Sequence, residues 1–542
     1  MQDFVFRGRK SGQWPKGGNP VEVNVALVQH RAYDVEHSEE GLEAVLAMLD
    51  EAASSGVDLA VLPECSYPGY YLGLSGDPVK AVQHWEDALK AFRDVATKRR
   101  VHVVAGIAEK DGARLYNSAY LIDREGGIAG RARKTFLWHF DSRWFSPGEE
   151  YRVFETDIGR IGMIVCADGR LPEIPRILAL KGAQIIADAT NWVTSGRDPA
   201  TLANPQVEYI VPVRAAENGV WLACANKVGR EADSVVYCGR SIVVSPTGET
   251  LKEASSDKEE IVTASLNLDP GQQHKALTER KDYFSSDYSL LTRPNEDTPL
   301  ARILEAPLVP AKSAVYVAVV QMDRDTSLKD FIQSGTALIS RLAQQGVDLV
   351  VFPETPCSVM REFEPPIRDA FRPLTAVFGI HVAVASHGRP HSVTSVFDPR
   401  GDILTFTGSG DELLDVGGLK VGFLRGRQAT VTEAARVLFL KGADLIAWQA
   451  DLATGLERKV CMTRAFENRT YVALANCSSR GSSRNSMIVS PDGRVLAETF
   501  PSTKQAVMAQ LSPAVSRLKQ LVRGTDVLMD RMPALYDELS RP

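Results

Sequence analysis

Five segments from the first half of this 542-residue chain recur in the second half, in the same order. The matching pairs are VNVALVQH (23–30) with VYVAVVQM (315–322), SSGVDLAVLPE (54–64) with QQGVDLVVFPE (344–354), LALKGAQIIAD (178–188) with LFLKGADLIAW (438–448), RAAEN (214–218) with RAFEN (464–468), and VVSPTGETL (243–251) with IVSPDGRVL (488–496). Such an ordered set is not a chance similarity, and a chain of this length is expected to form more than one domain.

The repeat predicts two tandem domains of one fold, over residues 21–293 and 314–542. The segment 294–313 is rich in proline and charge and is predicted to be a linker, whereas residues 1–20 form an N-terminal extension. In the first copy, short apolar runs alternate with amphipathic helical patterns, and the later strands follow one another more closely. This order favours an α/β sandwich over a purely parallel sheet.

Composition narrows the possible partners and locations. The net charge of −6 indicates no basic surface, so nucleic acid and anionic membranes are not expected partners, and no apolar run is long enough to span a bilayer. The seven cysteines are odd in number and form no CxxC pair, which argues against disulfides and a cysteine-rich zinc site. The histidines lack metal-ligand spacing. We expect a cytoplasmic protein without a metal or cofactor.

The stretch GRIGMIVCADGRLPE (159–173) places Cys166 after a short apolar run, where a buried strand is expected to end and a helix to begin. Free backbone N–H groups at such a junction lower the pKa of a thiol and can also hold an oxyanion. Cys166 is therefore a candidate nucleophile. The alternative is a cysteine packed in the core, which is the commoner role of a lone cysteine in an apolar strand.

The two copies differ at the positions where chemistry is expected. Alignment on the repeated segments places Gly426 opposite Cys166 and Ser409 opposite Lys134, while Glu354 matches Glu64. The second copy is also shorter between the glutamate and the cysteine position. We therefore predict that the second domain is degenerate and inactive.

The motifs of the first copy form an ordered set: a glutamate in LPE, a lysine in RKTFL, a cysteine in CADGRLPE, then LALKGA, NW, RAAEN and GRSIVVSPTG. This set resembles the nitrilase superfamily of carbon–nitrogen hydrolases, over nearly all of the first copy and most of the second. The resemblance implies an α-β-β-α sandwich and a catalytic triad of Glu64, Lys134 and Cys166. It also implies that the backbone N–H of Ala167 helps to hold the oxyanion.

The chemistry of amide cleavage suits these residue types. The Cys166 thiolate would attack the carbonyl carbon after Glu64, as general base, has taken its proton. Lys134 and the Ala167 N–H would stabilise the negative oxygen of the tetrahedral intermediate. A purely structural role is the alternative for Glu64, because the second copy keeps its glutamate although it lacks the cysteine.

The resemblance is incomplete at one position. Many amide-cleaving members carry a second glutamate between the lysine and the cysteine, and its nearest counterpart here is Asp141, which is one carbon shorter. Asp141 either takes this auxiliary role or is a solvated loop acid. Aromatic and histidine side chains near the catalytic segments are candidates for the substrate pocket: Tyr70, Trp138, His139, Trp144 and Trp192.

The residues after the cysteine bear on the reaction class. Nitrilases of this superfamily typically have Trp-Glu there, whereas this chain has Ala167-Asp168. A small amide or an N-carbamoyl compound is thus favoured over a nitrile as substrate. Acyl or amide-group transfer through the same thioester is an alternative, as are nitrile hydrolysis and a non-catalytic binding or scaffold role.

Members of the family commonly pair through the two helices that follow the cysteine. The corresponding segments here are about 171–183 and 200–218 in the first copy, and about 430–442 and 455–468 in the second. We expect these helices to pack the two copies into an intramolecular pseudo-dimer. Further association of whole chains is left open.

Overall fold

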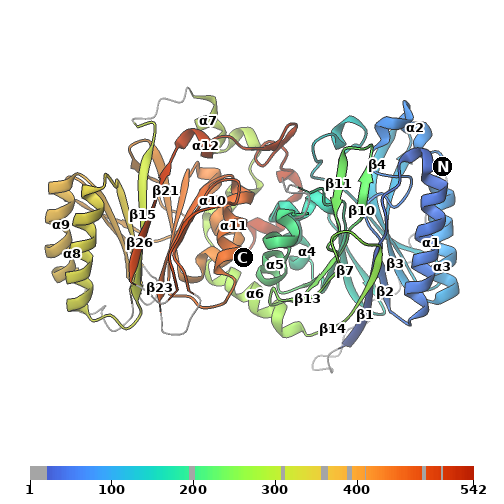
Figure 1. Ribbon diagram of the computed structural model, residues 1–542, viewed down its shortest axis with the longest axis horizontal. Coiled ribbons are helices and arrows are strands. Elements are labelled where there is room, and N and C mark those ends of the chain that lie inside the picture. The colour runs from blue at the N-terminus through green and yellow to red at the C-terminus, as the bar shows by residue number, and fades with distance from the viewer. Residues whose placement is uncertain are drawn as a thin grey trace. The chain divides into compact units, whose positions relative to one another are not determined.

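The computed structural model describes residues 21–194, 202–306, 312–355, 364–386, 393–408, 410–478, 484–501 and 504–542. The chain divides into two compact units, Met1–Thr278 and Glu279–Pro542 (Figure 1). The predicted extension over residues 1–20 lies outside the described residues. No helix within the described ranges is long and apolar enough to cross a bilayer.

Two six-stranded sheets lie at the centre of the first unit, in the orders β14-β1-β2-β3-β4-β5 and β13-β12-β9-β8-β7-β6. The strands of the first sheet are β1 (Val21–Gln29), β2 (Leu59–Val61), β3 (His102–Asp111), β4 (Arg114–Ile122), β5 (Ile128–Arg133) and β14 (Glu260–Leu268). Those of the second sheet are β6 (Val153–Thr156), β7 (Gly159–Val165), β8 (Ile185–Ala189), β9 (Trp221–Ala225), β12 (Ile242–Val244) and β13 (Thr250–Glu253).

Helices cover the outer face of each sheet. Strands β1, β2 and β3 pair in parallel, as do β7, β8 and β9, and parallel neighbours need a crossover connection. The crossovers α1 (Ser38–Ser54) and α3 (Trp85–Arg99) pack on the first sheet, while α4 (Glu173–Leu180) and α5 (Val211–Asn218) cover the second (Figure 1). The predicted α-β-β-α sandwich is confirmed.

The spacing of apolar residues along α1 explains which of them are buried between this helix and the first sheet. Val45, Leu49 and Ala52 repeat at three- and four-residue intervals on one face of α1, and all three are buried against the first sheet. Strand β3 passes close behind the end of β2. A Cβ atom at Gly106 would lie 2.2 Å from the Pro63 carbonyl oxygen, so only glycine allows this approach. The segment that carries Glu64 therefore packs directly against the backbone of β3.

The second unit repeats this arrangement with one difference. Pairing between β15 and β23 at Met322↔Cys477 joins its strands into one 12-stranded sheet. The strands are β15 (Val315–Asp323), β16 (Leu349–Thr355), β17 (His381–Ser386), β18 (Val393–Phe397), β19 (Ile403–Phe406), β20 (Leu414–Val416), β21 (Leu419–Arg425), β22 (Leu445–Ala450), β23 (Tyr471–Ser478), β24 (Met487–Val489), β25 (Val495–Glu498) and β26 (Gln505–Leu511). The helices α8 (Leu328–Gln344) and α9 (Glu364–Phe378) match α1 and α3, and α10 (Thr432–Lys441) and α11 (Glu457–Asn468) match α4 and α5.

The division between the units falls earlier than residue 293, the predicted end of the first domain. It lies inside helix α6 (Pro270–Asp282), because the residues that follow bond to the second unit. Arg280 Nε donates to Glu433 Oε1 at 2.7 Å, and Asn295 Nδ2 donates to the Arg531 carbonyl at 3.0 Å. Part of the predicted linker 294–313 also forms a helix, α7 (Pro299–Glu305), which Thr298 caps.

Candidate active site

Cys166 occupies a sharp turn between a strand and a helix in the first unit. Strand β7 ends at Val165, and Cys166 begins the short 3₁₀ helix Cys166–Arg170. The φ angle of Cys166 is 51°, a left-handed conformation that costs energy in a residue with a Cβ. Two buried side chains hold this backbone. Asp188 Oδ1 accepts the Cys166 N–H at 2.8 Å, and Gln206 Nε2 donates to the Cys166 carbonyl at 2.8 Å.

Asp168 joins this turn to the segment that carries Lys134. Its Oδ1 accepts the backbone N–H groups of Thr135 at 3.0 Å and Phe136 at 2.9 Å, and its Oδ2 accepts the Val165 N–H at 3.1 Å. One carboxylate thus sets the position of the lysine segment relative to the end of β7. Ala167 lies in the first turn of the 3₁₀ helix, where backbone N–H groups lack intrahelical acceptors.

Glu64 follows β2 and is fully buried. Its Oε1 accepts hydrogen bonds from Lys134 Nζ at 2.8 Å and from Asn117 Nδ2 at 2.5 Å. Its Oε2 is also buried and has no hydrogen-bond partner within the described residues. One oxygen is therefore held in place by two donors, while the other remains able to exchange a proton.

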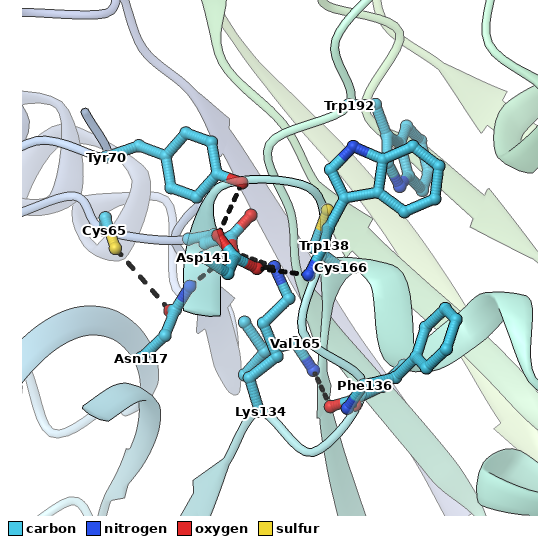
Figure 2. A network of polar contacts seen from close by, with 12 residues as sticks. Cys65, Tyr70, Asn117, Lys134, Phe136, Trp138, Asp141, Val165, Cys166 and Trp192 are labelled. Carbon is cyan, nitrogen blue, oxygen red and sulfur yellow. Dashed lines mark hydrogen bonds and ion pairs between the residues drawn. The ribbon is translucent and has the colours of Figure 1, made fainter. Parts of the chain in front are cut away.

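Asp141 is a second carboxylate in contact with the Lys134 ammonium group (Figure 2). Its Oδ2 is 2.6 Å from Lys134 Nζ and accepts the Trp138 N–H at 2.8 Å, while its Oδ1 accepts the Tyr70 hydroxyl at 2.7 Å. Asp141 and Lys134 are both fully buried, so Asp141 is not a solvated loop acid. The loop after the lysine brings the shorter side chain inward, and Lys134 is held between two carboxylates.

The electrostatics of the thiol differ from the expectation that backbone N–H groups lower its pKa. Burial raises the pKa of Cys166 well above its usual value, the Glu64 carboxylate adds to this, and the opposing effects of Lys134 and the Asn191 N–H are smaller. The expected lowering of the pKa is wrong because Cys166 is buried and the Glu64 carboxylate is near enough to act on it. A protonated thiol of this kind needs a general base to become a nucleophile.

The pKa values of the other two groups suit this requirement. Burial raises the pKa of Glu64, against the opposing charge of Lys134. For Lys134, burial by itself lowers the pKa, but the carboxylates of Asp141 and Glu64 outweigh it and hold the pKa well above its usual value. Lys134 thus stays positively charged, and Glu64 is a stronger proton acceptor than an exposed glutamate.

The five predicted pocket residues lie at different places. Tyr70 bonds to Asp141, as described, and the Trp138 ring lies 4.2 Å from the Arg170 guanidinium, which is close enough to Cys166 to interact with its charge. Trp192 is buried and directly follows Asn191, whose N–H contacts the thiol. Trp144 packs on Tyr71 and Phe140, and His139 is exposed with its ring edge-on to Phe140.

Sequence reasoning assigned no role to Asn117 or Asp188, which hold Glu64 and Cys166. A signal was present for Asp188, because an acid inside the apolar run IIADA is expected to have a buried partner. Asn117 has no comparable signal, since it approaches Glu64 only through the pairing of β3 with β4. Among the residues that the structure describes, no group of three or more His, Cys, Asp or Glu side chains could hold a metal ion.

The second unit keeps the turn but not the thiol. Strand β21 ends at Arg425, and Gly426 has a φ of 44°, close to that of Cys166. A Cβ atom on Gly426 would lie 3.1 Å from Glu354 Oε2, so the glutamate and the nucleophile position still face each other. Ser409, which the sequence places opposite Lys134, lies outside the described residues.

A buried histidine supports the loop that follows Glu64. His30 Nε2 lies 3.0 Å from Ser66 Oγ, and Nδ1 lies 2.7 Å from the Arg31 carbonyl. Burial, with the nearby charge of Lys227, lowers the pKa of His30 to about 3. His30 is therefore neutral in the folded protein at all pH values in ordinary use.

This shift predicts a loss of stability in mild acid. Between pH 6.5 and 3 the unfolded chain binds a proton at His30 that the folded chain does not, so the free energy of unfolding falls as the pH falls. At pH 5 the loss is about 2 kcal/mol relative to pH 8. Urea midpoints at both pH values should show this loss in the wild type and a smaller one in His30→Gln. Equal losses in both proteins would contradict the prediction.

The amino-acid sequence is similar to a known protein family and to individual proteins within it. A sequence model of the family described as Carbon-nitrogen hydrolase matches residues 24–276 and again residues 380–520. A nitrilase from Pyrococcus abyssi is 35% identical over 45% of this chain and 90% of its own length. An (R)-stereoselective amidase from a Pseudomonas species is 34% identical over 45% of this chain and 85% of its own length.

An amidase of known structure from Nesterenkonia sp. shares 26% identity, with a TM-score of 0.42, over 50% of this chain and 99% of that chain. The double match to the family model agrees with the two repeated copies in the sequence. Because the two matched segments together span more than half of the chain, the protein belongs to the carbon-nitrogen hydrolase family.

Proposed function

We propose that this chain hydrolyses the non-peptide C–N bond of a small amide or N-carbamoyl compound through a thioester on Cys166. The observation that carries the proposal is the buried group around the thiol. Glu64 has one oxygen held by Lys134 and Asn117 and one without a partner in the described structure, and its charge acts on a protonated Cys166. A base and an oxyanion donor are thus held at one nucleophile.

The proposed reaction begins with proton transfer from the Cys166 thiol to Glu64. The sulfur then bonds to the carbonyl carbon, and Lys134 Nζ and the Ala167 N–H stabilise the oxyanion. As the C–N bond breaks, Glu64 returns the proton to the departing amine, which leaves a thioester. Glu64 next takes a proton from water, the hydroxide displaces the sulfur, and the proton returns to Cys166 as the acid leaves.

Among the family's substrates, we infer an amide or N-carbamoyl compound rather than a nitrile. The support is the Ala167-Asp168 pair after the nucleophile. Within the described residues, the Asp168 carboxylate accepts hydrogen bonds from backbone N–H groups and from the Thr135 hydroxyl. The names of the relatives above include both a nitrilase and an amidase. The aromatic side chains of Trp138 and Trp192 near the thiol favour a substrate with an apolar or planar part.

The test is ammonia release by the purified protein from a panel of aliphatic amides, aromatic amides, N-carbamoyl amino acids and nitriles. We expect at least one amide or carbamoyl compound to be turned over, with nitriles at least about tenfold slower. A preference for nitriles would replace this assignment with nitrile hydrolysis. Adding hydroxylamine tests the transfer alternative, because a transferase would form hydroxamate in large excess over free acid.

We further propose that residues 314–542 form an inactive domain that packs on residues 21–293 as an intramolecular pseudo-dimer. The support is the glycine at the nucleophile position and the presence of counterpart helices, α4 and α5 in one unit and α10 and α11 in the other. An experimental structure with these four helices away from the contact between the units would contradict the pseudo-dimer. A cytoplasmic location is likewise a proposal, supported by the ordinary composition and by an odd number of cysteines, which does not favour disulfides.

A further inference from the structure

Besides the pairs that Lys134 forms, the first unit has a buried ion pair that contacts the loop carrying Glu64. Lys227 follows β9, and Glu231 ends β10 (Val228–Glu231), which forms a two-stranded sheet with β11 (Val235–Cys238). Lys227 Nζ lies 3.0 Å from Glu231 Oε1, and both side chains are 1% exposed. Burying two charges costs free energy that apolar residues of similar size would not cost, so such a pair calls for an explanation other than stability.

The pair contacts the backbone near both ends of one loop, residues 64–71. Lys227 Nζ donates to the Cys65 carbonyl at 2.9 Å, next to the peptide bond of Glu64. Glu231 Oε2 accepts the backbone N–H groups of Tyr70 and Tyr71, each at 2.9 Å. One charge therefore holds the start of the loop and the other holds its end.

Both ends of this loop carry groups of the candidate site. Glu64 stands at its start, and the Tyr70 hydroxyl near its end bonds to Asp141, which in turn contacts Lys134. Cys65, which Lys227 contacts, has a φ of 44°, and a left-handed conformation in a non-glycine residue persists only where its surroundings fix it. The ion pair thus contacts the backbone that positions Glu64, the proposed base, and Tyr70, which bonds to Asp141.

The second copy provides an internal comparison. Asn226 N donates to Ser241 Oγ at 2.9 Å, and Asn476 N donates to Ser486 Oγ at 2.9 Å, so these two asparagines are structural counterparts. The next residue is Lys227 in the first copy and Cys477 in the second, where the thiol contacts the Glu354 carbonyl. The lysine is thus present in the copy with a nucleophile and replaced in the copy with Gly426.

We propose that the Lys227–Glu231 ion pair is a positioning device for catalysis. It holds residues 64–71 so that Glu64 stays at the thiol and Tyr70 stays on Asp141. The inference rests on the proposed function, because it assigns these residues an effect on the reaction that Glu64, Lys134 and Cys166 perform. Neither Lys227 nor Glu231 contacts substrate in this proposal.

The test compares two variants with the wild type on the best substrate of the ammonia panel. In Glu231→Gln, one of the two acceptor oxygens becomes a donor, so the contacts to Lys227 and to the Tyr70 and Tyr71 amides cannot all persist. In Lys227→Met/Glu231→Leu, both charges are removed, so neither residue leaves an unpaired charge in the protein interior. We expect kcat to fall about 100-fold in both, with KM within about twofold, because a shift of about 1 Å in a catalytic group has an effect of this size.

A matched control comes from the same hairpin. Arg230 and Asp233 form an ion pair that is 67% and 91% exposed, and Arg230→Met/Asp233→Asn should leave kcat and the melting temperature unchanged. The positioning role is supported if the double variant melts like the wild type and still loses kcat. It is overturned if the folded double variant has wild-type kcat, or if both variants fail to fold. Absence of Cys166-dependent turnover in the wild type would instead remove the proposed function.

Discussion

Replacing the thiol group with hydrogen in Cys166→Ala should abolish turnover of every substrate that the wild type hydrolyses. We expect kcat to fall by about 10⁴-fold or more, because loss of the nucleophile removes the covalent route and leaves only binding and oxyanion stabilisation. Ammonia release under saturating substrate measures this directly. Stability should change little, since the side chain loses one buried atom and its backbone contacts to Asp188 and Gln206 persist.

Cys224→Ala is the matched control for this variant, because Cys224 is another buried cysteine of the same unit and lies within strand β9. It should keep wild-type kcat. Turnover above about 1% of wild type in Cys166→Ala would contradict the thioester route. Mass spectrometry of the wild type mixed with substrate and quenched in acid should find an acyl adduct on Cys166 alone.

Lys134→Met should damage both stability and catalysis. The substitution leaves Glu64 and Asp141 buried without the ammonium group that lies 2.8 Å from one and 2.6 Å from the other. Breaking a buried ion pair by removing one partner typically costs about 3–5 kcal/mol, and losing one oxyanion donor lowers kcat by about 10²–10³-fold. Urea unfolding and steady-state kinetics measure the two effects separately.

The double variant Lys134→Met/Asp141→Asn separates these effects further. Removing one of the two bare carboxylates should restore part of the lost stability, because fewer buried charges remain unpaired. The rate should stay low, because the ammonium group is still absent. Recovery of kcat together with stability would show that Lys134 acts only through the fold.

The short contacts of the site depend on loops whose course the local sequence does not specify. Asp141 is one carbon shorter than the glutamate of the family's pattern, and whether it reaches Lys134 depends on the path of residues 138–141 and on the Tyr70 hydroxyl. The structure of the predicted linker, residues 294–313, was likewise not specified by its local sequence. Its proline and charge content predicted a linker, but Asn295 bonds within the second unit and Thr298 caps a helix there.

The sequence by itself determined the two copies, the sandwich fold and the identity of Glu64, Lys134 and Cys166 as a candidate set. The copies and their strands and helices are readable because periodicity and turn residues are local and the repeated segments keep one order along the chain. The exchange of Cys166 for Gly426 was visible for the same reason. The sandwich and the candidate set follow from the resemblance of the ordered motifs to the nitrilase superfamily.

Only the tertiary structure decided the electrostatics and the supporting contacts of the site. The raised pKa of Cys166, the hydrogen bond from Asn117 to Glu64 and the contacts of the Lys227–Glu231 pair arise where segments far apart in the sequence meet. Desolvation and charge interactions depend on everything within a few ångströms of a group, not on its neighbours in sequence. A motif can therefore name a nucleophile and its base, while their protonation states and alignment are properties of the packed fold.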